Sequence, residues 1–191
     1  MSDERLRLFC GLQLPRETID ELTAWQAAHF KGLHLSGGRV VPPENLHVTL
    51  AFLGSRPAGE VPAIMAELRE ASARAGAIEL QPLRYRETRG VGMIVLKDVT
   101  GAATVLAEDL GARLERLGVY RFERRPWLSH VTVLRFKERA GLTPEVANIR
   151  SIHVVRSALY RSQLGRSSAE TSGATYDALE TAALGGVDDG S

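Results

Sequence analysis

The sequence predicts an α+β fold, in which helices and strands alternate irregularly and many strands are antiparallel neighbours. The expected order is strand, helix, strand, helix, strand, strand, and then helix, strand, strand, strand. Consecutive strands pair naturally as antiparallel neighbours, which favours α+β over a doubly wound parallel sheet. The 191 residues include 44% hydrophobic and 25% charged side chains, enough for one large core or two small lobes. No linker rich in Pro, Gly or Ser separates the halves, so we expect one domain over residues 1–183.

The first elements are a strand and a helix. Residues 5–14 alternate apolar with other side chains, which is typical of a strand. Pro15 ends this strand and suits the first turn of a helix that runs to about residue 29. Trp25 lies at helical spacing with other apolar residues of this helix, so we expect it in the core. A Gly-rich loop follows over residues 31–38, and the two prolines at 42–43 favour extended backbone after it.

The later elements follow from the same periodicities and from glycine and proline. In order, we expect a loop over residues 54–59, a helix over 62–75, strands over 78–87 and 91–99, a helix over 102–117 that Gly118 ends, a loop over 120–129, and strands over 151–162 and 173–182. From residue 184 the chain is rich in Gly and Asp, and residues 184–191 are expected to form a disordered tail.

One short apolar pattern occurs twice, once in each half of the chain. The copies are His47-Val48-Thr49-Leu50 and His130-Val131-Thr132-Val133. Both are typical of strands, and side chains alternate between the two faces of a strand. Each copy therefore places one imidazole and one hydroxyl on one face, while its apolar side chains anchor the other face in a core.

Two such strands facing each other would form a cleft with two imidazoles and two hydroxyls. Imidazoles exchange protons near neutral pH, and hydroxyls donate hydrogen bonds to phosphate oxygens. A single His-x-Thr on a strand is more often a structural pair, but its recurrence in similar surroundings indicates a shared site. The pattern therefore favours acid–base chemistry on a phosphate.

The repeated pattern resembles the two-histidine phosphoesterase superfamily, whose members carry two His-x-Thr/Ser strands in the two halves of one domain. Residues 43–54, Pro-Glu-Asn-Leu-His-Val-Thr-Leu-Ala-Phe-Leu-Gly, closely resemble the first motif of bacterial RNA 2′,3′-cyclic phosphodiesterases, formerly called 2′-5′ RNA ligases. The resemblance covers about residues 5–179. Ser129 stands where the family commonly has a proline before the second histidine, and the His-x-Thr unit itself is intact.

This resemblance implies a bilobal, pseudo-symmetric fold with a small antiparallel sheet in each lobe, helices outside and a central active-site cleft. It also implies that His47 and His130 are catalytic and that Thr49 and Thr132 bind phosphate. The family usually places an arginine five positions after the second histidine, and Arg135 stands there. Strand alternation alone would point Arg135 away from His130, so a bulge or the strand end would have to redirect it.

The implied reaction is hydrolysis of a 2′,3′-cyclic phosphate at an RNA end to a 2′-phosphate. One imidazole accepts a proton from water, the other donates one to the departing ribose oxygen, and the hydroxyls hold the non-bridging oxygens. The resemblance suggests His47 as the acid and His130 as the base, whereas the strand argument is symmetric and leaves these roles open. In reverse, the site would join a 2′,3′-cyclic end to a 5′-hydroxyl, with hydrolysis dominating in water.

The loop before the second motif carries further candidates. Trp127 or Tyr120 would stack on a base. The basic residues of this loop are as consistent with a solvated loop as with RNA contacts; they are Arg121, Arg124 and Arg125. We expect the remaining histidines to be structural or solvated, because His29 lies at a helix end, His34 lies in a Gly-rich loop and His153 lacks a following threonine.

Composition excludes several classes of protein. The net charge of +1 gives no general attraction to nucleic acid, so any RNA contact must come from a local basic site. Cys10 is the only cysteine, which excludes an internal disulfide and a cysteine-based zinc site, and we expect it to be a buried apolar residue. No cluster of Asp and His ligands is evident, so we expect neither a catalytic metal nor another cofactor.

The chain also lacks segments that address a protein to membranes. Its N-terminus has neither the basic region nor the apolar core of a signal peptide, and no stretch approaches the length of a membrane-spanning helix. We therefore expect a cytoplasmic monomer. Its expected partner is RNA or an oligonucleotide with a 2′,3′-cyclic phosphate end.

Two other functions stay open at this point. The same cleft would serve a non-catalytic module that binds RNA ends or nucleotides, although binding alone does not require two proton carriers. Another member of the superfamily would act on a different small cyclic phosphate, such as a cyclic nucleotide or an ADP-ribose-type cyclic phosphate.

Overall fold

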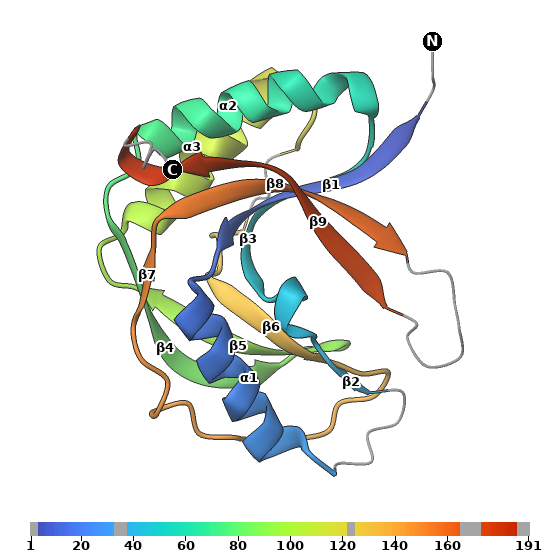
Figure 1. Ribbon diagram of the computed structural model, residues 1–191, viewed down its shortest axis with the longest axis vertical. Coiled ribbons are helices and arrows are strands. Elements are labelled where there is room, and N and C mark those ends of the chain that lie inside the picture. The colour runs from blue at the N-terminus through green and yellow to red at the C-terminus, as the bar shows by residue number, and fades with distance from the viewer. Residues whose placement is uncertain (1–3, 33–37, 122–124, 165–172, 187–191) are drawn as a thin grey trace.

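The computed structural model describes residues 4–32, 38–121, 125–164 and 173–186 (Figure 1). Its helices are α1 (Arg16–Phe30), α2 (Val61–Ala73) and α3 (Ala102–Arg116). Its strands are β1 (Arg5–Gln13), β2 (Arg39–Val40), β3 (His47–Pro57), β4 (Ile78–Glu87), β5 (Val91–Asp98), β6 (His130–Arg135), β7 (Ile152–Val154), β8 (Arg156–Leu164) and β9 (Ala174–Ala183). This combination of helices and antiparallel strands confirms the α+β class. Most of the predicted helices and strands begin and end within two residues of the observed bounds.

The described strands form one antiparallel sheet. Their order is β7-β4-β5-β6-β3-β1-β8-β9, and β2 pairs with β6 beside this path. We expected two separate small sheets, but the backbones of β3 and β6 pair at Val48 and Val131 and join the two groups of four strands. This junction lies in the middle of the sheet, and both repeated motifs lie on it.

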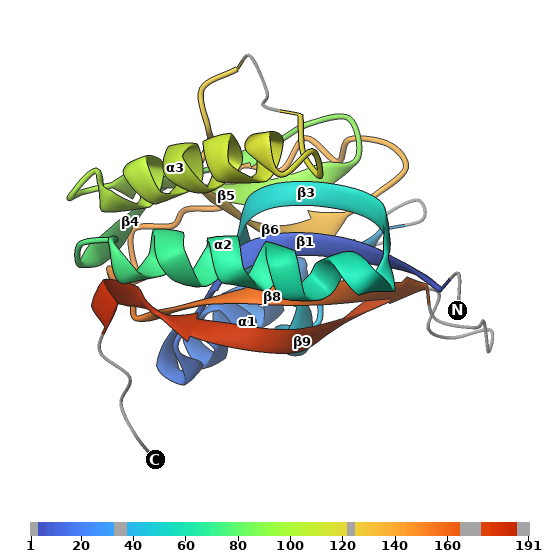
Figure 2. The ribbon, with the colours of Figure 1, turned by 90° about the horizontal axis from the view of Figure 1, so that it is seen from above.

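Helices α2 and α3 lie side by side over one face of the sheet (Figure 2). Helix α2 packs against β8 and β9, while α3 packs against β3, β4 and β5. The Arg113 guanidinium of α3 joins the two helices through an ion pair with Glu67 of α2, with an N–O distance of 3.1 Å. Fully buried leucines such as Leu68 and Leu110 fill the space beneath the helices, which fixes the positions of the central strands.

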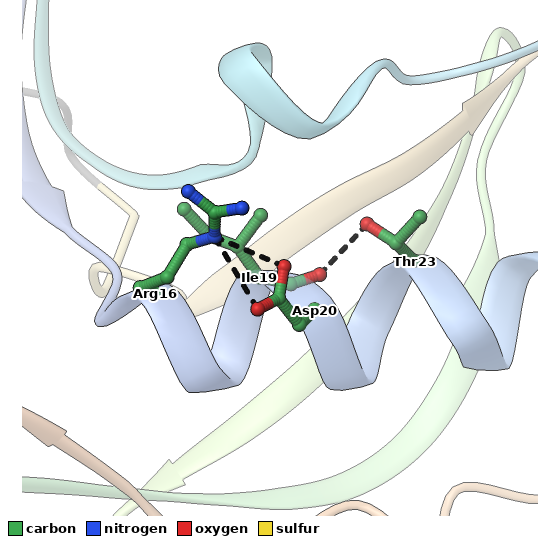
Figure 3. Close-up of polar contacts among 4 residues, drawn as sticks. All are labelled: Arg16, Ile19, Asp20 and Thr23. Carbon is green, nitrogen blue, oxygen red and sulfur yellow. Dashed lines mark hydrogen bonds and ion pairs between the residues drawn. The ribbon is translucent and has the colours of Figure 1, made fainter.

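Helix α1 begins directly after Pro15, as predicted, and its first turns are supported by local contacts. The Arg16 guanidinium donates to the Asp20 carboxylate one turn later, with a distance of 3.1 Å, and the Thr23 hydroxyl donates to the Ile19 carbonyl (Figure 3). The Arg16–Asp20 side chains face each other across one turn, and an ion pair at this spacing adds about 0.2–0.5 kcal/mol.

Contacts with distant segments fix the position of α1. Trp25 is buried, as predicted, and its indole N–H donates to the carbonyl of Glu145 at 2.8 Å. The buried Gln26 amide donates to the carbonyls of Val41 and Val133, at 3.0 and 2.8 Å. Helix α1 is therefore hydrogen-bonded both to the segment that leads into β3 and to the strand of the second motif.

The prediction of one strand over residues 151–162 is wrong. Val155 separates β7, which pairs with β4, from β8, which pairs with β1. Strands β4 and β1 lie in different halves of the sheet, so one continuous strand cannot pair with both. The chain therefore crosses from the outer strand of one half into the other half at this residue.

Two other boundaries differ from the prediction. Residues 54–57 were expected in a loop, yet β3 continues to Pro57 because β1 extends to Arg5 and supplies backbone partners. Gly54 allows this path through its positive φ of 69°. Residues 184–186 form a short 3₁₀ helix, with the Leu184 N–H donating to the Val155 carbonyl, so these three residues do not belong to a disordered tail, contrary to the prediction. Residues 187–191 lie outside the described part of the chain.

Candidate active site

The two His-x-Thr motifs lie on neighbouring strands at the centre of the sheet. Val48 of β3 is directly opposite Val131 of β6, and both side chains are fully buried. The two histidines and two threonines that flank these valines are partly exposed, which matches the predicted alternation. Because the strands are antiparallel, each motif histidine lies across from the threonine of the other motif. One chain thus brings two imidazoles and two hydroxyls together on one face.

Both motif strands contain a β-bulge at the same distance from the histidine. The pairing of β3 with β1 skips Leu50, and the pairing of β6 with β5 skips Val133. A bulge shifts the alternation of the strand by one residue. After it, Leu134 is buried, and Arg135 is partly exposed on the side of the second histidine. The structure therefore contains the bulge that Arg135 was expected to need, and the equivalent residue of the first motif is Phe52, which is 65% exposed.

Backbone carbonyls orient both imidazoles in the same way. Nδ1 of His47 lies 2.7 Å from the Asn45 carbonyl oxygen, and Nδ1 of His130 lies 2.8 Å from that of Leu128. A carbonyl only accepts hydrogen bonds, so each Nδ1 carries the proton and donates it. Nε2 is then the nitrogen that can exchange a proton in the neutral ring. In His47 it lies 3.0 Å from the Thr49 hydroxyl and accepts its hydrogen.

The environment of His47 favours the neutral imidazole. Burial lowers the pKa of His47 to about 4, against the hydrogen bond to the Asn45 carbonyl, which raises it. The positive charges of His130 and Arg135 lower it further, so both groups lie near enough to act on the ring. At neutral pH His47 is therefore uncharged in the free protein.

Four aromatic residues line the site beside His47, and sequence reasoning missed this grouping. The rings of Phe9, Tyr160 and Tyr176 lie 4.7, 5.7 and 5.3 Å from the imidazole. Phe52 extends the group, with its ring 6.0 Å from that of Phe9. These residues come from β1, β3, β8 and β9, and no short motif links them; we call them the aromatic wall. Burial raises the pKa of Tyr160 to about 12, so its phenol stays protonated.

Gly11 of β1 allows β3 and His47 to approach closely. It pairs with Thr49, and a Cβ added to it would lie 2.9 Å from the Val48 carbonyl oxygen. The same Cβ would lie 3.4 Å from Cδ2 of His47. The absence of a side chain at Gly11 is therefore part of the geometry of the first motif.

The buried side chain of Asn45 connects the last strand to the first motif. Its amide nitrogen donates to the Ala174 carbonyl at 2.7 Å, and its oxygen accepts from the Tyr176 N–H at 3.1 Å. The backbone carbonyl of the same residue orients His47. Asn45 thus positions Tyr176 and His47 together.

The two aromatic residues proposed to stack on a base are packed against the protein. The Trp127 indole N–H donates to the Thr49 carbonyl at 3.0 Å, which fastens the loop before β6 onto β3. Trp127 and Tyr120 are both partly buried against the core. Arg121 and Arg125 are exposed, and Arg124 lies outside the described residues.

His29 and His153 lie on elements other than the two motif strands. His29 is exposed at the end of α1, where its ring contacts Trp25, and His153 is exposed on β7. His34 lies outside the described residues. Cys10 is fully buried, and burial raises the pKa of its thiol to about 12.

The residues that the structure describes include neither a metal-binding group nor a helix that could span a membrane. Among them, no set of three or more His, Cys, Asp or Glu side chains is arranged to hold a metal ion. The three α-helices of the described chain are too short or too polar to cross a bilayer.

Sequence comparison places the chain among known phosphodiesterases. Residues 12–84 match the family model described as LigT-like phosphoesterase. The RNA 2′,3′-cyclic phosphodiesterase of Thermus thermophilus is 32% identical over 190 residues, which cover 95% of this chain and 91% of that protein. The protein of the same name from Escherichia coli K12 is 28% identical over 163 residues, covering 85% and 90% of the two chains.

Solved structures agree with this placement. Escherichia coli LigT, crystallised in complex with 3′-AMP, superposes with a TM-score of 0.80 at 28% identity, over 95% of this chain and 99% of that one. TT0787 of Thermus thermophilus gives a TM-score of 0.78 at 29% identity, over 95% and 99%. With near-complete coverage in sequence and in structure, and with both His-x-Thr strands side by side, the chain belongs to the RNA 2′,3′-cyclic phosphodiesterase family of LigT-like phosphoesterases.

Proposed function

We propose that the protein hydrolyses the 2′,3′-cyclic phosphate at an RNA end to a 2′-phosphate, with His47 and His130 as the acid–base pair. The observation that carries this proposal is the pairing of β3 with β6, which sets both motifs on one face of the sheet. Each imidazole has its Nδ1 engaged by a carbonyl, which leaves Nε2 for proton transfer. The names of the relatives support the same substrate class.

The reaction needs one base and one acid at the same phosphorus. Water attacks phosphorus and gives its proton to His130, while the bond from phosphorus to O3′ breaks and O3′ takes a proton from His47. This direction follows the family resemblance and leaves the phosphate on O2′. The hydroxyls of Thr49 and Thr132, together with the Arg135 guanidinium, would hold the non-bridging oxygens as negative charge develops there.

The low pKa of His47 is compatible with its role as the acid only when substrate is bound. In the free protein, burial and neighbouring positive charge favour the neutral ring. A phosphate anion beside the ring favours the protonated form and raises its pKa. We infer that the substrate itself brings His47 into the state that donates a proton. The reverse reaction, in which an RNA 5′-hydroxyl attacks instead of water, would use the same residues.

The nucleoside has an adjoining surface to bind. The aromatic wall is continuous with the first motif, and Phe52 is its exposed ring. Bases stack on aromatic side chains without strong sequence preference. A base placed there would lie next to His47, whereas Trp127 and Tyr120 are partly buried against the core. The crystal of Escherichia coli LigT with 3′-AMP supports nucleotide binding in this family.

The proposed unit of function is one monomeric, pseudo-symmetric domain. The order strand, helix, motif strand occurs as β1-α1-β3, with the short β2 inserted before β3, and again as β5-α3-β6, and both motif strands carry the bulge at the same position. This repetition supports a duplication in which each half supplies one histidine. Both histidines come from one chain, so a second copy is not needed to complete the site.

The test is hydrolysis of an oligoribonucleotide that ends in a 2′,3′-cyclic phosphate, followed by mass and linkage analysis of the product. Replacing His47 or His130 with alanine should each lower kcat by about 100- to 10,000-fold, the usual contribution of a general acid or base. The double variant should lose far less than the product of the two losses, because the residues act as a unit. Thr49→Val and Thr132→Val should lower kcat by a smaller factor, since each removes only one neutral hydrogen bond.

His153→Ala is the matched control, because this histidine is exposed on β7, outside the motifs. Its activity should equal that of the parent. If a folded variant without either motif histidine retained most activity, the two halves would not share a catalytic site. A protein that binds the product but never turns over substrate would instead be a nucleotide-binding module.

A further inference from the structure

Arg7 lies on the same face of β1 as the aromatic wall. The pairing of β1 with β8 is uninterrupted from Arg7, opposite Ser162, to Leu12, so side chains alternate regularly over this stretch. Phe9 belongs to the aromatic wall, and Gly11 lies next to His47. Residues 8, 10 and 12 point to the other face and are buried in the core. Arg7 therefore shares the face of Phe9 and Gly11.

The Arg7 guanidinium has no partner among the described residues, in contrast to its neighbours. Arg5 donates to Ser55, Arg56 pairs with Glu60, and Arg161 pairs with Asp177. Arg7 is exposed, and the strand residues paired with it are Ser55 on β3 and Ser162 on β8. A positive charge between two serines, with no acidic partner in the described part of the chain, is suited to an anion.

The position of Arg7 along β1 suits the second phosphate of a nucleotide whose first phosphate lies at the motifs. Successive residues on one face of a strand are about 7 Å apart, so Phe9 lies about 7 Å and Arg7 about 13 Å beyond Gly11. The order is therefore the reactive phosphate site, the aromatic ring and then the cation. A terminal nucleotide with its cyclic phosphate between the motifs and its base on the aromatic wall would direct its 5′-phosphate towards Arg7.

We propose that Arg7 binds the phosphodiester on the 5′ side of the terminal nucleotide, so that the site recognises two successive phosphates. This inference rests on the proposed function and extends it from the reactive end to the chain that carries it. The protein would then prefer an oligonucleotide over a cyclic mononucleotide, which has no second phosphate. The effect is on binding, because Arg7 lies too far along the strand to touch the reacting atoms.

A binding experiment isolates the second phosphate. The probes are a nucleoside 2′-monophosphate and the corresponding 2′,5′-bisphosphate, titrated calorimetrically into the parent and into Arg7→Gln. The parent should bind the bisphosphate about fivefold more tightly, a modest gain because the arginine is exposed. Arg7→Gln should remove this gain and leave binding of the monophosphate unchanged. Arg7→Lys should keep most of it, since lysine retains the charge.

Arg74→Gln is the matched control. This arginine is also exposed, but it lies at the C-terminal end of α2, in the helical layer. The control should bind both probes as the parent does. The inference would be overturned if the parent bound the two probes with equal affinity. It would also be overturned if Arg7→Gln lowered the affinity for both probes by the same factor.

Kinetics separate this inference from the function on which it rests. Arg7→Gln should raise KM about fivefold for a dinucleotide that ends in a 2′,3′-cyclic phosphate, with kcat unchanged, and leave both constants unchanged for the cyclic mononucleotide. Because each phosphate contact releases counterions, the variant should also show a weaker salt dependence for the dinucleotide. If the parent hydrolyses both substrates and Arg7→Gln does not distinguish them, only the role of Arg7 fails. If the parent hydrolyses neither, the proposed function fails with it.

Discussion

His47 experiences an environment unlike that of a histidine on the surface. Three aromatic rings surround it, its Nδ1 is engaged by a carbonyl, and positive groups lie nearby. In the unfolded chain the same imidazole would be hydrated and would titrate near its ordinary pKa of 6.5. Folding therefore removes proton affinity from this residue, and the pH dependence of stability must reflect it.

The direction of that dependence follows from proton binding. Between about pH 6.5 and pH 4 the unfolded chain binds more protons at this histidine than the native protein does, so stability falls as the pH decreases through this window. For His47 alone the loss between pH 7 and pH 5 should be about 2 kcal/mol. Urea unfolding of the parent and of His47→Gln at both pH values measures it. Between pH 7 and pH 5, the free energy of unfolding should fall by about 2 kcal/mol more in the parent than in the variant. Equal decreases in the two proteins would contradict a lowered pKa of His47.

At the scale of single elements, the two bulges decide which side chains face the site. Without Val133 as an extra residue, Arg135 would point into the core and Leu134 would lie on the face of the motif histidines. Without Leu50, Phe52 would likewise be turned away from the aromatic wall. The two strands thus present different residues, one cationic and one aromatic, at equivalent positions. Under the proposed function, this difference would separate a side for phosphate from a side for the nucleoside.

The close approach of β1 to β3 can be tested at Gly11. In Gly11→Ala, the new Cβ would meet the Val48 carbonyl at 2.9 Å, so the two strands must separate and His47 must shift. We expect a loss of stability of about 1–3 kcal/mol, as for overpacked sites. We also expect kcat to fall at least about tenfold, because small displacements of catalytic groups are costly. Thermal unfolding and steady-state kinetics measure the two effects.

Gly59→Ala provides the comparison, because a Cβ at this exposed glycine would have nothing within 4 Å. It should retain the stability and the kcat of the parent. A Gly11→Ala protein with full activity would show that the position of His47 does not depend on this contact.

At the scale of the whole molecule, the proposed chemistry uses only side chains of the chain itself. Proton transfer is assigned to the two histidines and charge stabilisation to Arg135 and the two threonines. Chelation with EDTA should therefore leave kcat and KM unchanged within error, with the cyclic oligonucleotide as substrate. A loss of turnover that added divalent metal restores would show that a metal ion takes part, and the assignment of charge stabilisation to these residues would have to be abandoned.

Local patterns in the sequence predicted the helices, most strands and the faces of the motif histidines and threonines, because periodicity reports which side of an element is buried. Other features depend on contacts between distant segments, for which periodicity carries no signal. The aromatic wall joins residues from β1, β3, β8 and β9, and only their pairing brings the rings together. The break at Val155 was missed for a similar reason, since the segment is uniformly strand-like although its two parts pair with different halves of the sheet.

The crossing at Val155 has a consequence for how the protein is made on the ribosome. Strand β1 is synthesised first, yet its partner β8 and the following β9 emerge last. Until they emerge, β1 has an unpaired edge that can associate with other chains. Both histidines are already present in the nascent chain by then, but Tyr160 and Tyr176 are not, so His47 acquires these two aromatic neighbours only after β8 and β9 have been synthesised.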